Sequence, residues 1–418
     1  MESKAMEGKA MEDKLIEYAR VIVQVGVNLQ KGQTLVIACP LECAEFGRMI
    51  AEEAYNAGAR EVVMRWVDEL STRMKYLRAD GTVFDEIADW LKTFFYEYAN
   101  KKAALVSIAA SDPELLKGVD PDRLRRGDIA SGRELKGFRD MQMRNEFPWC
   151  VISVPTTVWA SKVFPDAAPE AVNGKLWDAI LSAVRVSGDG KAVDKWQEHI
   201  ARLKKRINIM NGHQFAKLTY KNSLGTDFTV ELHEKAIWVG VGEKAGTGYS
   251  FVANMPSEEV FILPKKYGIN GVICSSIPLS LDGTLVKEIR FTVKDGKIIE
   301  ATASEGLETL LEKLEVDEGA RYFGEVALVP YNSPISNMGI LFFNTLFDEN
   351  ASCHLAFGKA YPTFSDAEDI SDEELKARGA NDSYIHVDFM IGTPDMSITG
   401  VTASGETVPV FVDGDFAF

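Results

Sequence analysis

Hydrophobic and polar positions follow one pattern in the first half of the chain and another in the second. Up to about residue 212, short continuous apolar runs, such as QTLVIAC at 33–39 and AALVSIAA at 103–110, alternate with stretches of helical apolar spacing. Continuous runs are typical of strands buried on both faces. The alternation predicts the α/β class, with a mostly parallel sheet and flanking helices.

The elements predicted in this half follow from those runs. Strands are predicted at 33–39, 60–67, 103–110 and 149–155, and helices at 15–29, 44–58, 84–102, 176–188 and 192–212. Gly58 stands where a helix C-terminus favours glycine. We therefore assign residues 14–212 to an N-terminal α/β domain and place the boundary at the polar residues around Gly212.

After residue 213 the apolar period becomes that of strands with one buried face. Alternating runs occupy 215–222, 227–233 and 286–304, and one helical stretch follows at 307–315. The Asp295-Gly296 pair lies between two alternating runs and predicts a type I′ hairpin turn. We expect residues 213–418 to form a second domain of the α+β class, rich in antiparallel strands.

Composition and charge narrow the classes of function. The 418 residues are 46% hydrophobic and carry a net charge of −16, which indicates a globular protein and excludes nucleic acid as a partner. No apolar run is long enough to span a membrane. The start of the chain lacks an apolar signal segment, and the five scattered cysteines favour a reducing compartment. We interpret the protein as cytoplasmic.

Acids and histidines in strand-like contexts are the candidate chemistry. Glu258 and Glu259 precede the apolar run VFILP, and Glu325 lies inside FGEVALVP. In IHVDFMIG, His386 and Asp388 are two positions apart, so both would project from the same face of a strand. By the same rule, Glu258 and Glu259 would point in opposite directions.

Carboxylates in buried strands need a positive partner. Without one, burial of an ionised carboxylate is strongly unfavourable. The segment ENASCHLAFGKAY contains His354 and a single cation, Lys359. Oxygen and imidazole ligands without thiolate suit Zn, Co, Mn or Mg. The residues alone leave the ordinary alternatives open: a solvent-facing Glu325, a structural pair of His386 with Asp388, and a loop histidine at His354.

Six segments together carry a family resemblance. NMPSEEVF, GEVALV, SPIS, FFNTLFDENASCHLAFGKAY, HVDFMIG and DGDF, in this order, resemble the thermophilic metallo-aminopeptidases of the aminopeptidase T, aminopeptidase S and PepS group. The resemblance implies an exopeptidase that hydrolyses the N-terminal peptide bond of peptides with a free N-terminus. It also implies two divalent metal ions in the C-terminal domain and a homodimer.

The resemblance also assigns roles to individual residues. Metal ligands are expected at Glu259, Glu325, His354, His386 and Asp388, with Glu349 as a further acidic ligand. Glu258 is the candidate general base. Tyr361 is expected to donate a hydrogen bond to the oxyanion that develops on the scissile carbonyl.

Two alternatives remain at this point. The scaffold also resembles ring-cleaving pyridine-diol dioxygenases, in which two histidines and one aspartate hold one Fe(II); here these would be His354, His386 and Asp388. A single iron does not need Glu259 or Glu325, and the presence of both favours hydrolysis. A non-catalytic metal-binding protein would bind metal without turnover.

Overall fold

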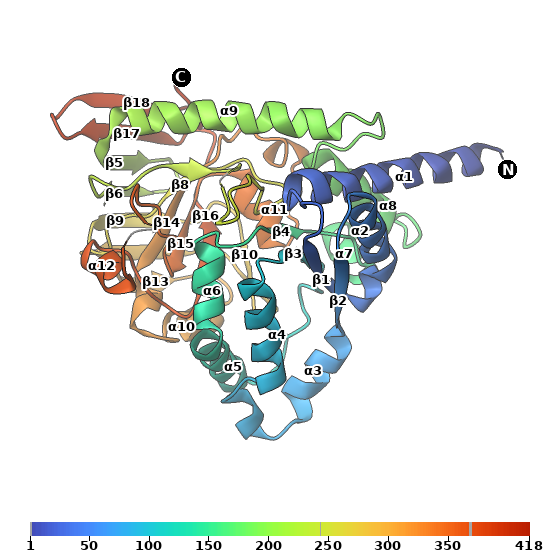
Figure 1. Ribbon diagram of the computed structural model, residues 1–418. Coiled ribbons are helices and arrows are strands. Elements are labelled where there is room, and N and C mark those ends of the chain that lie inside the picture. Colours follow the sequence, from blue (N-terminus) through green and yellow to red (C-terminus); the bar gives the residue numbers. More distant parts are fainter. Residues whose placement is uncertain (1, 243, 368–369) are drawn as a thin grey trace.

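The computed structural model describes residues 2–242, 244–367 and 370–418. In these residues, a four-stranded parallel sheet comes first, and the named strands after residue 213 pair antiparallel (Figure 1). The α/β class and the antiparallel character of the second half are therefore confirmed. Figure 1 shows the parallel sheet on the right, the antiparallel strands on the left, and α9 across the top of both.

The N-terminal sheet has the strand order β2-β1-β3-β4. Its strands are β1 Thr34–Pro40, β2 Glu61–Val67, β3 Ala104–Ile108 and β4 Trp149–Ile152. The inner strands β1 and β3 are buried along nearly their whole length, which explains their unbroken apolar sequences. All four strands lie where the sequence predicts them.

Helices surround this sheet. They are α1 Glu2–Val21, α2 Ala44–Asn56, α3 Glu69–Arg78, α4 Asp89–Asn100, α5 Pro121–Glu134, α6 Lys136–Met143, α7 Thr157–Val163, α8 Val172–Ala183 and α9 Ala192–His213. The predicted helices are confirmed with shifted ends, and Gly58 adopts a φ of 93° just beyond α2. The sequence pattern did not predict α3, α5, α6 or α7. Helix α5 is rich in charge, so its apolar stripe is sparse, although the Asp120 side chain caps its N-terminus.

Two larger sheets follow in the second half. The strand order of one is β13-β12-β9-β6-β5-β17-β18-β19, and that of the other is β16-β15-β14-β8-β7; β10 and β11 form a separate pair. The strands are β5 Phe215–Lys221, β6 Asp227–Glu231, β7 Val239–Gly240, β8 Val260–Ile262, β9 Ile269–Cys274, β10 Leu279–Leu281, β11 Thr284–Val286, β12 Arg290–Lys294, β13 Lys297–Thr302, β14 Phe323–Leu328, β15 His354–Gly358, β16 His386–Met390, β17 Ser397–Thr402, β18 Thr407–Val412 and β19 Asp415–Phe416. The helices are α10 Leu307–Leu314, α11 Thr345–Asp348 and α12 Asp372–Ala377.

The predicted hairpin at Asp295-Gly296 is present. Both residues have positive φ, 48° and 75°, as a type I′ turn requires, and they join β12 to β13. Aromatic rings from both large sheets meet in the core: the ring centroid of Phe291 on β12 lies 5.1 Å from that of Phe389 on β16. The long sheet therefore covers one face of the shorter one, whose opposite face is free to carry chemistry.

The predicted division at residue 212 falls at the end of α9, where Gln214 takes a left-handed conformation before β5 begins. One continuous cluster of buried apolar residues contains side chains from both halves, including Tyr18, Trp159 and Phe389. The two-domain division therefore stays a prediction.

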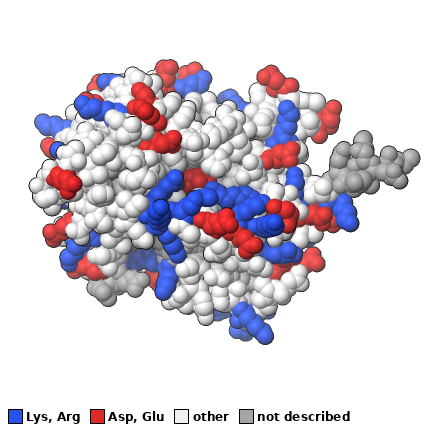
Figure 2. Space-filling view, turned by 90° about the horizontal axis from the view of Figure 1, so that it is seen from above, with Lys and Arg blue, Asp and Glu red and all other residues white. Residues whose placement is uncertain are grey.

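The surface in Figure 2 mixes both signs of charge, except for a band of Lys and Arg on the face that α9 occupies at the top of Figure 1. Arg202, Lys204 and Lys205 of α9 are exposed. Among the helices of the described residues, none combines the length and apolar composition that crossing a bilayer requires.

Candidate metal centre

Strand register gathers most of the predicted site residues on one face of the five-stranded sheet. Glu325 of β14 pairs with Ala356 of β15, and Ala356 pairs with Asp388 of β16, so the three lie in one row. His354 and His386 are each two positions from this row on their own strands and therefore share its face. Because Ala356 is small, space remains between the two carboxylates.

A β-bulge aims Glu325 at this face. The pairing of β14 with β15 shifts register between Phe323 and Glu325, which makes Gly324 the extra residue. A Cβ at Gly324 would lie 2.2 Å from the carbonyl oxygen of Lys359. Only glycine therefore allows the two strands to approach this closely beside Glu325.

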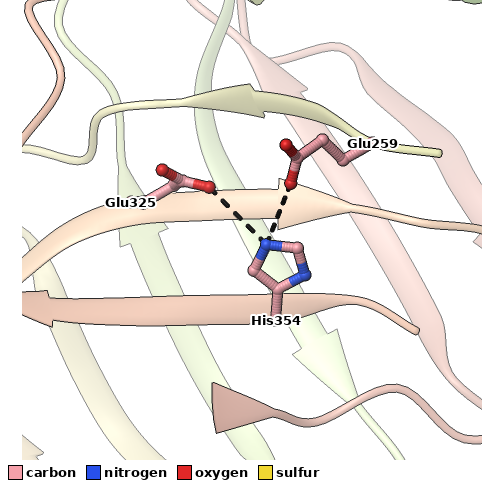
Figure 3. Close-up of side chains that lie close together, drawn as sticks. All are labelled: Glu259, Glu325 and His354. Atoms are coloured by element: carbon pink, nitrogen blue, oxygen red, sulfur yellow. Dashed lines mark ion pairs between the residues drawn. The ribbon is translucent and has the colours of Figure 1, made fainter. Parts of the chain in front are cut away.

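Four short distances define the centre. Nε2 of His354 lies 3.1 Å from Glu259 Oε2 and 3.6 Å from Glu325 Oε1 (Figure 3). Nε2 of His386 lies 3.6 Å from Glu325 Oε2 and 3.4 Å from Asp388 Oδ1. The two oxygens of Glu325 thus face different histidines. Within the described residues, these side chains form two groups able to hold a metal, and Glu325 belongs to both.

Backbone carbonyls set the tautomer of both histidines. Nδ1 of His386 lies 2.7 Å from the carbonyl oxygen of Lys359, and Nδ1 of His354 lies 3.2 Å from that of Ser352. A carbonyl oxygen only accepts, so each Nδ1 carries a proton and donates it. In the neutral histidines the Nε2 lone pairs then face the carboxylates, which is the arrangement of imidazole metal ligands.

A bound cation would stabilise the ionised form of the buried carboxylates in this cluster. Burial raises the pKa of Glu325 to about 7, and burial together with Asp388 and Glu259 raises the pKa of Glu349 well above its usual range. Burial alone would lower the pKa of His386, but Asp388 and Glu325 raise it to about 9. Each shift shows that the carboxylate-rich cluster retains protons, because among the described residues no Lys or Arg forms an ion pair with it.

The donor set fits divalent metal ions. Nε2 of His354 and Oδ1 of Asp388 are fully buried and make no hydrogen bond among the described residues, although polar neighbours lie 3.1 Å and 3.4 Å away. Buried polar atoms without a hydrogen bond are costly unless a bound group satisfies them. Oxygen and imidazole donors without thiolate are the ligands that Zn, Mn, Co or Mg would take.

A cavity of about 870 Å³ opens onto this cluster. Its walls include Glu259, Glu325, Glu349, His386, Asp388 and Tyr361. The ring of Tyr361 stands edge-on to that of His386, with centroids 5.4 Å apart. Aromatic side chains such as Trp149, Phe251 and Phe261 line other parts of the wall, so the cavity offers apolar surface beside the charged cluster.

Comparison with known proteins decides the family. The family model of thermophilic metalloproteases, M29, matches residues 11–416. The chain belongs to this metalloprotease family. The match confirms the predicted resemblance and the predicted enzyme class, a metal-dependent aminopeptidase that hydrolyses peptide bonds.

Similar proteins extend over the full chain. It is 43% identical to aminopeptidase 2 of Geobacillus stearothermophilus, over 97% of this chain and 98% of that one, and 41% identical to aminopeptidase AmpS of Bacillus subtilis, over 98% and 100%. The solved structure of wild-type AmpT from Thermus thermophilus has a TM-score of 0.88 and 34% identity, covering 98% of this chain and 100% of that one. A 2,5-dihydroxypyridine dioxygenase from Pseudomonas putida, at TM-score 0.51 and 11% identity over 97% and 96% of the chains, shares the fold alone.

The structure does not bring Glu258 to the metal centre of this M29 chain. Glu258 is buried but does not line that cavity, and its carboxylate contacts the guanidinium of Arg185. Glu259, the next residue, faces His354 instead, so the two glutamates do point in opposite directions as predicted. This placement does not favour the predicted role of Glu258 as general base.

Glu349 and Tyr361 line the cavity of this M29 site but belong to neither metal-holding group of the described residues. Glu349 begins the short helical turn Glu349–Ala351 and lines the cavity, but it belongs to neither of the two metal-holding groups within the described residues. Tyr361 follows β15 and reaches the same cavity. Its pKa is raised well above 10, first by burial and then by the surrounding carboxylates, so its hydroxyl keeps its proton.

Two residues that support this M29 site were not predicted from the sequence. Asn350 accepts a hydrogen bond from the backbone N–H of Glu258 at 2.7 Å and donates one to Glu349 at 3.3 Å, which ties the segment of Glu259 to that of Glu349. Arg185 holds Glu258 from the far side. A lone arginine in the apolar run AILSAVRV is the sequence signal that marks Arg185 as a buried partner.

Proposed function

We propose that this aminopeptidase works with two divalent ions per chain, held by two ligand groups that share Glu325. Glu259 and His354 would complete one group, and His386 and Asp388 the other. The observation that supports this proposal is the position of Glu325, whose two oxygens face two different histidines 3.6 Å away. Ions bound there would lower the pKa of a water molecule toward neutrality and polarise the scissile carbonyl.

The chain's own residues supply the remaining chemistry. The hydroxyl of Tyr361, protonated at neutral pH, donates a hydrogen bond to the oxygen of the scissile carbonyl as negative charge develops there. Glu349 lines the cavity with its carboxylate outside both ligand groups, and bound cations would offset the charges of Asp388 and Glu259 that raise its pKa, so it takes the role of base that the resemblance suggested for Glu258. It accepts a proton from the attacking water and returns it to the nitrogen of the leaving amine.

Recognition of a free N-terminus follows from the same charge. Glu349 lines the cavity outside the metal-holding groups, next to Glu259 and Asp388, which belong to them. An α-ammonium would therefore be attracted to this end of the cavity, and a blocked N-terminus would not. The substrates are peptides with a free N-terminus.

Metal removal and metal counting test the proposal. Purified protein treated with EDTA is expected to lose hydrolysis of amino-acyl fluorogenic amides and to regain it with Zn, Co or Mn. Mass spectrometry of metals should give two ions per chain. Full activity in the metal-free protein would contradict the proposal.

A matched pair of variants tests whether Glu325 belongs to the metal site. Glu325→Gln is expected to lower kcat/KM by orders of magnitude and to reduce metal content, because it removes the carboxylate that both groups share. Glu300→Gln makes the same change at an exposed position of β13 and is expected to leave both measurements unchanged. Near wild-type turnover of Glu325→Gln would remove Glu325 from the site.

The iron-dioxygenase alternative lacks support at the site. It requires His354, His386 and Asp388 around one ion, yet within the described residues the two histidines fall in different metal-holding groups. One iron per chain together with oxygen consumption on a dihydroxypyridine would reverse this conclusion.

The proposal also includes a homodimer located in the cytoplasm. Light scattering coupled to gel filtration tests the dimer.

A further inference from the structure

A second cavity, of about 750 Å³, adjoins the metal centre from the side of α6. In the described residues it shares part of its wall with the first cavity, including Glu349, Tyr361 and His386. A ligand whose reacting bond lies beside His386 can therefore extend into either cavity. The carboxylates of the first cavity are the place for an α-ammonium, so the rest of a peptide would lie in the second.

Of the described cations that line the second cavity, the lysines are each paired with a carboxylate, whereas the arginine is not. Lys136 lies 2.6 Å from a carboxylate oxygen of Asp140, Lys359 lies 2.5 Å from another oxygen of Asp140, and Lys313 lies 2.6 Å from Asp128. Arg139 also lines this cavity but has no carboxylate within ion-pair distance among the described residues.

Arg139 is held in place by neutral groups. One terminal nitrogen donates to the carbonyl oxygen of Tyr384 at 3.0 Å, and the other donates to Ser131 Oγ at 2.8 Å. A guanidinium has five N–H donors, so donors remain for a further acceptor. Burial lowers the pKa of Arg139; Asp128 opposes this shift but is itself paired with Lys313.

We propose that Arg139 binds the C-terminal carboxylate of short peptide substrates, which makes the enzyme favour peptides of two to four residues over longer ones. A planar guanidinium pairs with a carboxylate through two hydrogen bonds, and the second cavity holds no other unpaired cation among the described residues. This inference rests on the proposed aminopeptidase function and deepens it.

The expected length of the substrate is consistent with the chain path between Arg139 and the cluster. Tyr384, which accepts the hydrogen bond from Arg139, lies two residues before His386, a backbone distance of at most about 7 Å. Each residue of an extended peptide spans roughly 3.3–3.6 Å. The proposal takes one to three residues beyond the scissile bond, a span of roughly 3 to 11 Å, to bridge the metal centre and Arg139.

Pairs of peptides that differ only at the C-terminus test the inference. The probes are Leu-Gly, Leu-Gly-Gly, Leu-Gly-Gly-Gly and a hexapeptide, each as free acid and as C-terminal amide, with leucine p-nitroanilide as a substrate that has no peptide C-terminus. Wild-type protein loaded with metal is expected to show a kcat/KM at least about tenfold higher for the acid than for the amide at one short length. The hexapeptide pair should differ less than about twofold.

Variants of Arg139 separate recognition from support of the fold. Arg139→Gln should bring the acid-to-amide ratio to about one and leave leucine p-nitroanilide unaffected, whereas Arg139→Lys should restore part of the ratio. Arg133→Gln, the same change at an exposed position of α5, should keep the wild-type ratio. A purely structural role, through the contact with Tyr384, would instead slow acids, amides and anilide equally and would overturn the inference.

The experiment distinguishes failure of this inference from failure of the proposed function. If the wild type hydrolyses acids and amides equally at every length, Arg139 does not read the carboxylate, and the aminopeptidase function stands. If metal-loaded protein hydrolyses none of the peptides and no anilide, the proposed function fails and this inference fails with it.

Discussion

Acidification is predicted to destabilise the protein through one buried histidine, His199 on α9. Its side chain is 2% exposed, and its Nε2 lies 2.7 Å from the carbonyl oxygen of Ser257. Its Nδ1 lies 3.2 Å from terminal nitrogens of both Arg185 and Arg202. Guanidinium groups only donate, so Nδ1 must accept, and His199 is neutral with its proton on Nε2.

A second proton on His199 would break this arrangement. It would sit on Nδ1 and face two guanidinium groups, those of Arg185 and of Arg202 on α9. Burial, followed by the charge of Arg185, lowers the pKa of His199 to about 3. In the unfolded chain the pKa is about 6.5. Below pH 6.5 the unfolded state therefore binds the proton and the folded state does not.

The sign and size of the effect follow from this difference. Because the folded pKa is depressed, the stabilisation is complete above pH 6.5 and is lost as the pH falls toward 3. At pH 5 the solution is about 1.5 units below the unfolded pKa, so the free energy of unfolding should be lower than at pH 7 by about 2 kcal/mol from His199 alone.

Urea unfolding of the wild type and His199→Gln between pH 8 and pH 4.5 isolates this term. Glutamine cannot titrate, but its amide can still accept from the arginines and donate to Ser257. The free energy of unfolding of the wild type, minus that of the variant, should fall by about 2 kcal/mol from pH 7 to pH 5. With 13C-labelled histidine, the NMR signal that disappears in the variant should not titrate above pH 4.

Two results would refute this reasoning. One is a stability difference between wild type and variant that stays constant within about 0.5 kcal/mol over this range, when about 2 kcal/mol is expected. The other is a midpoint near pH 6.5 for the histidine signal assigned to His199. Either would mean that His199 accepts a proton in the folded protein at little cost.

Three further substitutions test the packing and the chemistry of the site. Arg185→Met should lower the free energy of unfolding by about 3 kcal/mol in urea, because Glu258 remains buried without its contact, and adding Glu258→Gln should restore most of it. Gly324→Ala places a Cβ 2.2 Å from the Lys359 carbonyl oxygen and should weaken metal binding by about tenfold in a chelator competition. Tyr361→Phe should lower kcat by about 10²-fold at similar KM; a change confined to KM would assign Tyr361 to substrate binding.

The sequence predicted those elements of the fold whose burial or backbone conformation restricts the choice of residues. The unbroken apolar runs of β1 and β3 reflect strands covered on both faces, and the Asp295-Gly296 turn was visible because its positive φ angles restrict residue choice. Helices α5 and α6 were missed because their exposed faces are strongly charged and their apolar stripes are short. Local periodicity is weak wherever a helix packs with only a few residues.

The candidate site was predictable in its residue types but not in its arrangement. Alternation showed that Glu258 and Glu259 face opposite ways, yet only the fold shows that Arg185 takes the first and His354 faces the second. The partner of Glu258 is 73 residues away in sequence. Nor does any spacing rule reveal Arg139, whose relevance depends on a cavity formed by both halves of the chain.

Register couples the metal centre to the folding of the sheet. On β16, Asp388 faces the cluster while the next residue, Phe389, packs against Phe291 of the other sheet. A slip of one residue would turn Asp388 into the aromatic core and Phe389 toward the cavity, exchanging a buried ring for a buried unpaired carboxylate. The core therefore selects the register that builds the site. Metal binding then adds stability to the same register, because the carboxylates approach one another only in that pairing.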